Sequence, residues 1–243
     1  MKDSDGNRMT RVYLIRHGET VDAEPKRYKG TIDVPLSERG IEQIRSLARY
    51  LSQNREDRAQ NTDHREQSTD NRQQNADRRT QNSVLTALYC SGLSRALKSA
   101  ELIGEPFGFA PVVHHGLRER NFGAWEGMSF DEIKTEFPDA FRKWAENPLE
   151  FSPMGGESTI EVKDRAMKAF REITERHEGG VIAIVAHGGI NRVILCELLG
   201  MPLENIFRIE QDFASMNIID LWDYPVVKLI NGAEAYCNTP LQA

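Results

Sequence analysis

Apolar residues along this chain fall into two patterns, and each pattern predicts a different element. Continuous apolar runs are typical of buried strands, and three occur at residues 12–16 ("VYLIR"), 86–91 ("TALYCS") and 181–187 ("VIAIVAH"). Segments in which apolar residues recur every three or four positions predict amphipathic helices. These segments cover residues 37–51, 93–104, 130–137, 139–146, 159–177 and 190–199.

The order of these elements predicts one α/β domain. Buried strands that alternate with helices form a mostly parallel sheet with helices on both faces. We therefore expect a single three-layer α/β/α domain, made of residues 11–51 and 84–236. A short strand ("PVVHH") and a hairpin ("SMNIIDLWD" and "VVKLI") would complete the sheet. Residues 1–10 are expected to form a flexible tail, and residues 237–243 a carboxyl-terminal one.

Residues 52–83 differ in composition from the rest of the chain. They contain no Leu, Ile, Val, Phe, Tyr or Trp, and they repeat every seven residues as NREDRAQ, NTDHREQ, STDNRQQ and NADRRTQ. A coiled coil needs apolar a and d positions, which this repeat lacks. We expect a low-complexity, disordered insertion that forms a solvated loop or a frayed extension of the preceding helix. The alternative is an arm that docks a partner.

The overall composition narrows the classes of function. The chain has 243 residues and a formal net charge of −6, which gives no general attraction for nucleic acid or an anionic membrane. Its three cysteines form no C-x-x-C pair, so neither a zinc site nor a redox couple is expected. No signal peptide is recognisable, and no apolar run approaches the roughly 20 residues that span a bilayer. We expect a cytoplasmic protein with reduced thiols.

Five residues with chemically versatile side chains follow the predicted strands. Arg16 and His17 end the first strand, and Arg95 ("SGLSRA") begins the helix after the second. Glu119 ("LRERNFGAWEG") comes just past the third strand, and His187 ("VAHGG") ends the fourth. Ligands of parallel α/β sheets bind at the carboxyl ends of the strands. Each residue alone has an ordinary explanation as a solvated or hydrogen-bonded surface group, but two arginines and two histidines at one edge indicate a bound anion such as phosphate.

The motifs "LIRHGET", "SGLSRA", "LRERNFGAWEG", "GGES" and "VAHGG", in this order, resemble the phosphoglycerate mutase-like branch of the histidine phosphatase superfamily. The resemblance covers the chain apart from the amino-terminal tail and the heptad insertion. It implies a three-layer α/β fold and metal-free phosphoryl transfer through a phosphohistidine, with no cofactor.

The roles that the resemblance implies agree with the chemistry of the side chains. His17 would be the nucleophile, a neutral imidazole with one nitrogen held by a backbone carbonyl. Arg16 and Arg95 would hold phosphate oxygens with planar, always-charged forks. His187, protonated in the complex, would donate to the transition state. Glu119 would protonate the leaving alkoxide and then accept a proton from water.

Further substrate contacts are expected from the same loops. Gly188 opens a helix and could donate its backbone N–H to phosphate. Thr20 and Gly30 lie in the segments next to the nucleophile. The family often places an Asn six residues after its nucleophile, where this chain has Ala23. Lys29 in "RYKG" is a candidate to supply charge in its place.

Other candidate groups carry less weight. His114 and His115 would point to opposite faces of a strand and could not share a metal. Cys90 is a rival nucleophile, but the C-x-x-x-x-x-R loop of cysteine phosphatases is absent because Arg95 comes one position too early. No metal ligands are therefore assigned.

The sequence predicts a phosphomonoesterase that acts on a small phosphorylated metabolite. The stretch "RYKGTIDVPLSERG" resembles α-ribazole phosphatases, so α-ribazole 5′-phosphate is a candidate substrate. The alternative is a phosphoglycerate mutase-type phosphotransferase, in which Arg142 and Lys143 would bind a carboxylate. Only 37 residues separate Glu119 from Glu157, which is short for the cap of a mutase. A non-catalytic phosphate-binding adaptor is the alternative from another class. The oligomeric state is not predicted.

Overall fold

The computed structural model describes residues 8–23, 27–63 and 85–233. Six strands form one sheet in the order β3-β2-β4-β1-β5-β6. Their bounds are β1 Thr10–Arg16, β2 Ala87–Cys90, β3 Val112–Val113, β4 Val181–Ala186, β5 Met216–Leu221 and β6 Pro225–Gly232. Strands β1 to β4 run parallel to one another, whereas β5 is antiparallel to both β1 and β6. The predicted sheet of mostly parallel strands is confirmed.

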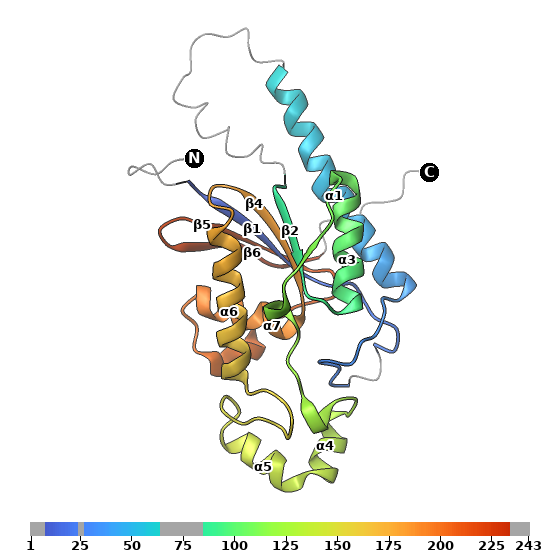
Figure 1. The fold of residues 1–243 in the computed structure, drawn as a ribbon, viewed down its shortest axis with the longest axis vertical. Coiled ribbons are helices and arrows are strands. Elements are labelled where there is room, and N and C mark those ends of the chain that lie inside the picture. The colour runs from blue at the N-terminus through green and yellow to red at the C-terminus, as the bar shows by residue number, and fades with distance from the viewer. Residues whose placement is uncertain (1–7, 24–26, 64–84, 234–243) are drawn as a thin grey trace.

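Helices cover both faces of this sheet (Figure 1). Their bounds are α1 Glu38–Asp63, α3 Ser94–Gly104, α4 Phe130–Glu136, α5 Pro138–Glu146, α6 Thr159–Glu175 and α7 Gly188–Leu198. Helices α1 and α3 pack on one face, and α6 and α7 pack on the other. The three-layer α/β/α architecture is therefore confirmed.

The central strand β4 shows why the two faces need different partners. All six of its residues are buried, and successive side chains of a strand point to opposite faces. Ile182, Ile184 and Ala186 join the core under α6 and α7. Val181, Ala183 and Val185 join the core under α1 and α3. A strand with no polar face is stable only between two helical layers.

The parallel strands bring their carboxyl ends to the same edge of the sheet. Strands β1 and β2 both pair with β4, with Arg16 opposite Ala186 and Cys90 opposite Val185. The residues that directly follow these three strands are therefore neighbours in space, although they are far apart in the sequence.

Residues 118–158 leave this edge and form a cap that carries α4 and α5 (Figure 1). Aromatic contacts hold the cap together. The rings of Trp125 and Phe151 stack with centroids 5.3 Å apart, and Trp144 contacts both Trp125 and Phe141. Helix α4 begins with a capping box between Ser129 and Glu132. The cap thus has a small apolar core of its own, which lies outside the sheet.

Three sequence-based boundaries are wrong. Strand β1 begins at Thr10, which is buried, so the flexible tail expected at residues 1–10 was predicted to reach too far. The third strand contains only Val112 and Val113, because His115 already begins a 3-10 turn. The argument from opposite strand faces therefore fails for His114, whose ring instead bonds Gly116 N at 3.2 Å and lies 3.2 Å from Glu172.

Helix α1 continues to Asp63. Residues 52–63 therefore extend the preceding helix, which is one of the two forms expected for the insertion, and only the expectation of disorder is wrong for them. The reason is local: this stretch contains no Gly or Pro, and Arg, Gln, Glu and Ala have high helix propensity. The expectation of disorder for the rest of the insertion falls on residues 64–83, which lie outside the described residues. The expected tail at 237–243 lies outside them as well.

Within the described ranges, no helix combines the length and the apolar character needed to cross a membrane.

Helix α1 is part of the cooperative core on one face of the sheet, and this yields a first prediction. Leu47 is fully buried, so Leu47→Ala should lower the free energy of unfolding by about 2–5 kcal/mol through the cavity it creates. Arg49→Ala alters an exposed position on the same helix and should stay within about 0.5 kcal/mol of wild type. Urea unfolding measures both, and equal losses would show that α1 does not belong to the core.

Candidate active site

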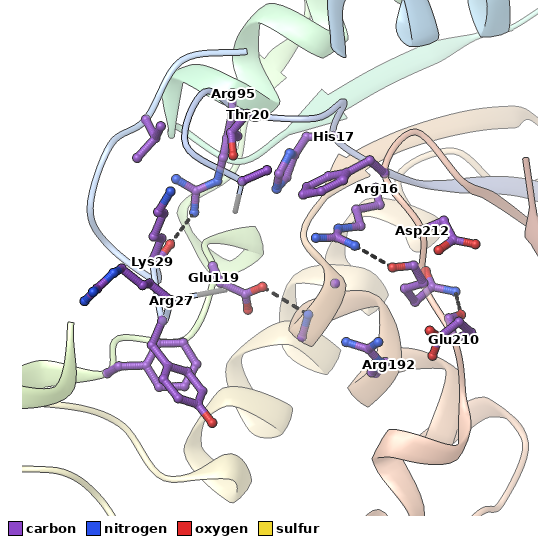
Figure 2. Close-up of a pocket in the computed structure, with 18 residues that line it drawn as sticks. Arg16, His17, Thr20, Arg27, Lys29, Arg95, Glu119, Arg192, Glu210 and Asp212 are labelled. Carbon is purple, nitrogen blue, oxygen red and sulfur yellow. Dashed lines mark hydrogen bonds between the residues drawn. The ribbon is translucent and has the colours of Figure 1, made fainter. Parts of the chain in front are cut away.

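A polar cavity of about 470 Å³ opens at the carboxyl ends of the parallel strands (Figure 2). We call it the phosphate cavity. Four of the five predicted catalytic residues line it: Arg16, His17, Arg95 and Glu119. The rest of its lining is Thr20, Ala23, Arg27, Tyr28, Lys29, Val34, Phe122, Gly188, Gly189, Arg192, Glu210, Gln211, Asp212 and Phe213.

His17 is held rigidly where β1 ends. Its backbone N–H donates to Ala186 O at 3.1 Å, and its carbonyl accepts from Ala214 N at 3.0 Å. In the ring, Nδ1 lies 2.7 Å from the carbonyl oxygen of Gly18. A carbonyl can only accept, so Nδ1 carries the hydrogen of the neutral ring and Nε2 keeps its lone pair. This is the arrangement expected of a nucleophile.

Burial and charge keep His17 neutral. Its side chain is only 5% exposed. Desolvation lowers the pKa of His17 well below its ordinary value, and the positive charges of Arg16 and Arg95 lower it further, against the hydrogen bond to Gly18. The same arginines that would bind a phosphate therefore keep the imidazole unprotonated.

Arg16 projects from the end of β1 beside this ring. Its Nη1 donates to Gln211 O at 2.5 Å, and its guanidinium carbon lies 3.9 Å from the centroid of the Phe213 ring. Desolvation lowers the pKa of Arg16 to about 10, although Glu119 opposes the shift, so the group stays charged at neutral pH. Its Nε has no hydrogen-bond partner among the described residues.

The loop that anchors Arg16 is itself fixed by a buried amide network. The Gln211 side chain donates to Asn217 Oδ1 at 2.8 Å and accepts from Asn191 Nδ2 at 3.1 Å. Asn217 in turn donates to Leu14 O of β1 at 2.9 Å. These bonds tie the loop to β1, β5 and α7, so the position of Arg16 is set by three elements.

Arg95 enters the cavity from the first turn of α3. Its guanidinium donates to three carbonyls of one loop: Ile32 O at 2.8 Å, Gly30 O at 2.8 Å and Lys29 O at 3.0 Å. Burial lowers the pKa of Arg95, and Glu119, Asp33 and Glu126 counteract this shift. Arg95 is therefore a fixed cation whose orientation depends on the loop that carries Lys29.

Glu119 faces these cations from the cap side of the cavity (Figure 2). Its Oε1 accepts from Arg120 N at 2.9 Å, and its Oε2 accepts from Gly189 N in the first turn of α7 at 3.0 Å. A Cβ at position 189 would lie 2.4 Å from Oε1, so glycine is required there for the carboxylate to approach the helix.

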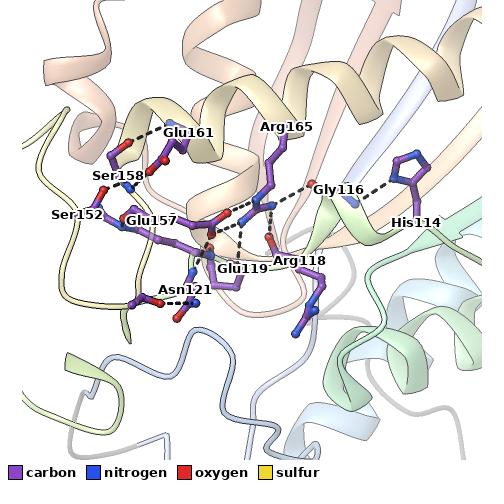
Figure 3. A network of polar contacts seen from close by, with 12 residues as sticks. His114, Gly116, Arg118, Glu119, Asn121, Ser152, Glu157, Ser158, Glu161 and Arg165 are labelled. Atoms are coloured by element: carbon purple, nitrogen blue, oxygen red, sulfur yellow. Dashed lines mark hydrogen bonds and ion pairs between the residues drawn. The ribbon is translucent and has the colours of Figure 1, made fainter. Parts of the chain in front are cut away.

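A second arginine network holds the loop of Glu119 from behind (Figure 3). Arg165 on α6 donates to the carbonyls of Gly116, Arg118 and Glu119 at 3.0, 2.6 and 3.1 Å. It also forms two hydrogen bonds with the carboxylate of Glu157, at 2.7 and 2.8 Å. Glu157, from the "GGES" motif, also accepts from Asn121 N at 2.9 Å. The motif thus fixes the loop of the proposed acid and does not line the phosphate cavity.

His187 lies behind His17 and not in the cavity wall. Its side chain is 0% exposed, and the two ring centroids are 5.1 Å apart. Its Nε2 lies 2.6 Å from Ser91 Oγ, whereas Nδ1 has no partner among the described residues. Burial lowers the pKa of His187 well below its ordinary value, with His17, Arg95 and Arg16 adding to the effect. The lowered pKa favours a neutral His187, and its protonation in a complex with substrate stays a prediction.

The expected accessory residues divide into two groups. Thr20, Lys29, Gly188 and Ala23 line the phosphate cavity, and the Lys29 ammonium donates to Asp22 O within its own loop. Gly30 does not line the cavity. It approaches the backbone of the Glu119 loop so closely that a Cβ there would collide with Arg120 O.

The rival assignments receive no support from the geometry. Arg142 and Lys143 line none of the described cavities, and Arg142 pairs with Asp139 on the surface. Cys90 is buried, and desolvation raises the pKa of its thiol to about 12, which disfavours a nucleophilic thiolate. No cluster of metal-binding side chains occurs among the residues that the structure describes.

Sequence reasoning missed several residues that build the site. Arg192 lines the cavity one turn after Gly188, and this helical spacing was a usable signal. Ser91, inside the "CSGLSRA" motif, could have been suspected as well. No sequence signal marks Arg165 or Phe213, because their roles depend on how distant segments meet.

Comparisons with known proteins agree with this geometry. A family model described as histidine phosphatase superfamily (branch 1) matches residues 12–65 and 66–231. Phosphoserine phosphatase 1 of Hydrogenobacter thermophilus is 28% identical over 213 residues, covering 88% of this chain and 87% of the relative. The metal-independent phosphoserine phosphatase of Arabidopsis thaliana is 30% identical over 190 residues, covering 76% of this chain and 67% of the relative.

Solved structures share the fold. The α-ribazole phosphatase of Shigella flexneri superimposes with a TM-score of 0.72 at 25% identity, and the match covers 92% of this chain and 96% of that one.

The depressed pKa of His17 predicts a loss of stability in acid. An unfolded histidine has a pKa near 6.5. Below that pH the unfolded chain therefore binds a proton at position 17, whereas native His17 does not. The free energy of unfolding of wild type should therefore fall more steeply with decreasing pH than that of His17→Gln, by about 1.4 kcal/mol per pH unit, between about pH 6.5 and 5. Urea unfolding at several pH values measures both slopes, and values at pH 7.5 provide the reference. Parallel curves would show that native His17 takes up a proton over the same pH range as the unfolded chain.

Proposed function

The chain belongs to the histidine phosphatase superfamily, and on this premise we propose that it is a metal-independent phosphomonoesterase that works through a phosphohistidine on His17. The observation that carries the proposal is the state of His17: a neutral ring, with Nδ1 bonded to Gly18 O, that faces a cavity holding two anchored arginines. A small phosphorylated metabolite is the proposed substrate.

The proposed reaction has two steps. First, His17 Nε2 forms a bond to phosphorus while the bond from phosphorus to the ester oxygen breaks, and protonated Glu119 gives its proton to the leaving alkoxide. Arg16 and Arg95 neutralise the charge that spreads over the phosphoryl oxygens. In the second step a water molecule gives a proton to Glu119 and its oxygen forms a bond to phosphorus. The bond from phosphorus to His17 Nε2 breaks, which releases phosphate and restores His17.

The position of Glu119 supports its role. The carboxylate lies across the cavity from Arg95, on the cap side, where an ester oxygen pointing away from His17 would be located (Figure 2). The bonds from Arg120 N and Gly189 N fix it there. Arg165 is a positioning residue, because it holds the backbone of the same loop.

Hydrolysis is favoured over transfer to a second hydroxyl. The pair Arg142 and Lys143 does not line the cavity, so a carboxylate-binding function has no support there. Relatives named phosphoserine phosphatase and glucosyl-3-phosphoglycerate phosphatase cover most of this chain. The similarity to an α-ribazole phosphatase makes α-ribazole 5′-phosphate a candidate substrate.

The covalent step predicts a trapped intermediate. Rapid-quench mass spectrometry with p-nitrophenyl phosphate, in excess EDTA, should detect a phosphoryl adduct on the peptide that contains His17. His17→Ala should abolish both the adduct and turnover while keeping a cooperative thermal transition. An adduct on Cys90, or activity that needs an added divalent ion, would contradict the proposal.

The proton-transfer role of Glu119 predicts a dependence on the leaving group. Glu119→Gln cannot donate a proton, and general acid catalysis typically contributes about 10²–10⁴-fold. We therefore expect a loss of that size in kcat/KM for alkyl phosphates, whose leaving groups are strongly basic. The loss should be much smaller for p-nitrophenyl phosphate, which departs without a proton.

A matched variant tests whether this effect is specific. Glu150 is an exposed carboxylate on the cap that lines neither of the cavities next to Glu119, so Glu150→Gln should leave both substrates unaffected. If Glu119→Gln lowers kcat/KM for both substrate types by the same factor, Glu119 is not the acid.

A further inference from the structure

A second cavity of about 540 Å³ adjoins the phosphate cavity. The two share five lining residues: Tyr28, Glu119, Phe122, Gly189 and Arg192. The proposed general acid thus lies on the boundary between them. Because the ester oxygen must lie beside this acid, the alcohol portion of a substrate has to extend past Glu119, and the second cavity is what lies there.

The walls of this second cavity are mostly apolar, and we call it the apolar chamber. Trp125, Trp144 and Leu149 of the cap form one side of it. Val162 of α6 and Val193 of α7 contribute from the helices. Leu203, Ile206 and Phe207 of the 3-10 helix Leu203–Arg208 line it as well.

The polar groups in the chamber wall are already engaged. Arg120 uses all three guanidinium nitrogens within the protein, donating to Glu157 O, Thr159 Oγ1 and Phe151 O at 2.8, 3.0 and 3.3 Å. Thr159 Oγ1 also donates to Pro148 O at 3.2 Å. Three of the five guanidinium N–H groups of Arg120 and the only hydroxyl hydrogen of Thr159 are thus used within the protein, which limits their capacity to bind a carboxylate or a sugar hydroxyl.

The charges of the chamber argue in the same direction. Glu204 lines it on the side of the 3-10 helix and would repel an anion. Arg192 lies on the boundary, where its Nε donates to Ile209 O at 2.7 Å. It lines the phosphate cavity as well as the chamber. Arg120 and Arg192 bring two positive charges to the chamber lining, and Glu119 and Glu204 bring two negative ones. The lining therefore has no net positive charge that would attract a carboxylate on the alcohol portion of a substrate.

We infer that the apolar chamber binds the alcohol portion of the substrate, and that this enzyme selects phosphomonoesters of alcohols bearing a large apolar or aromatic ring system. The inference rests on the proposed phosphatase function and adds the substrate class. Cavities of about 300–1,000 Å³ with mostly apolar walls are typical of sites for ring-bearing small molecules. Small carboxylated esters such as O-phosphoserine fit this chamber poorly, although relatives carry that substrate in their names.

Three primary alkyl phosphates test the inference without changing the leaving-group chemistry: 2-(2-naphthyl)ethyl phosphate, ethyl phosphate and O-phosphoserine. All three need a proton from the acid, so differences among them report on the chamber. We expect kcat/KM for the naphthylethyl ester to exceed that of the other two by about tenfold or more, the scale on which apolar pockets discriminate. The inference is overturned if kcat/KM for ethyl phosphate or O-phosphoserine equals or exceeds that for the naphthylethyl ester. If p-nitrophenyl phosphate is still hydrolysed in that case, the phosphatase function remains intact.

Chamber variants make the test specific. Phe207 is 79% exposed, so Phe207→Asp should not disturb folding while it adds a second acid to the chamber wall. Trp144→Ala removes one aromatic wall. Both should lower the preference for the naphthylethyl over the ethyl ester by about threefold or more. Tyr224 is an aromatic residue of similar exposure, 69%, that lines none of the described cavities, and Tyr224→Asp should leave the preference unchanged.

Binding of the product alcohol provides a readout that does not depend on turnover. 2-(2-Naphthyl)ethanol should bind wild type, as measured by calorimetry, and bind Trp144→Ala at least about threefold more weakly. If p-nitrophenyl phosphate is not hydrolysed but the alcohol still binds in this pattern, the proposed function fails and the chamber assignment stands. Absence of alcohol binding to wild type overturns the chamber assignment, whatever the enzyme hydrolyses.

Discussion

The structure depends on the enclosure of two guanidinium groups beside a neutral imidazole. Taking a charge out of water is costly unless the protein supplies compensating dipoles. The lowered pKa values of Arg16 and Arg95 reflect that cost. Backbone carbonyls supply the compensation: three from the loop of residues 29–32 for Arg95, and that of Gln211 for Arg16. The loops around the cavity are therefore held where the arginines need acceptors.

The same enclosure accounts for the two histidines. Low solvent access and the adjacent cations remove the proton from His17, which leaves the lone pair that a nucleophile requires. They act on His187 in the same way, although it is in the second layer, bonded to Ser91 and not exposed to the cavity. A phosphate dianion at the arginines would reverse the electrostatic part of both shifts. Because desolvation is the larger cause of both shifts, phosphate would oppose only their smaller, electrostatic part.

The parts of the fold that could be predicted from the sequence are those governed by local patterns. The apolar runs locate the parallel strands, so the residues that follow them, Arg16, His17 and Arg95, could be placed at one edge. An extension of α1 is one of the two forms that the composition of residues 52–83 predicts, but the residue at which the helix ends could not be predicted, since its last turns have no apolar stripe and only helix propensity to mark them. The contacts of Arg165 could not be predicted either, because they join carbonyls of residues 116–119 to the carboxylate of Glu157, which lies 38 positions after Glu119. Position 187 was placed correctly after its strand, but the sequence cannot show that the ring turns behind His17.

Chemistry and selectivity are carried by different parts of the chain. The ends of β1, β2 and β4 hold the phosphate cavity, and their positions are fixed by the register of a sheet that is buried on both faces. Much of the apolar chamber comes from the cap and from the 3-10 helix after α7, which lie outside the sheet. Substitutions there change the shape of the chamber without moving the strand ends. Glu119 belongs to both parts, since its loop enters the cap while its carboxylate is bonded to the first turn of α7. The bond from the Gly189 N–H to the Glu119 carboxylate thus joins the loop that enters the cap to the helix that follows β4.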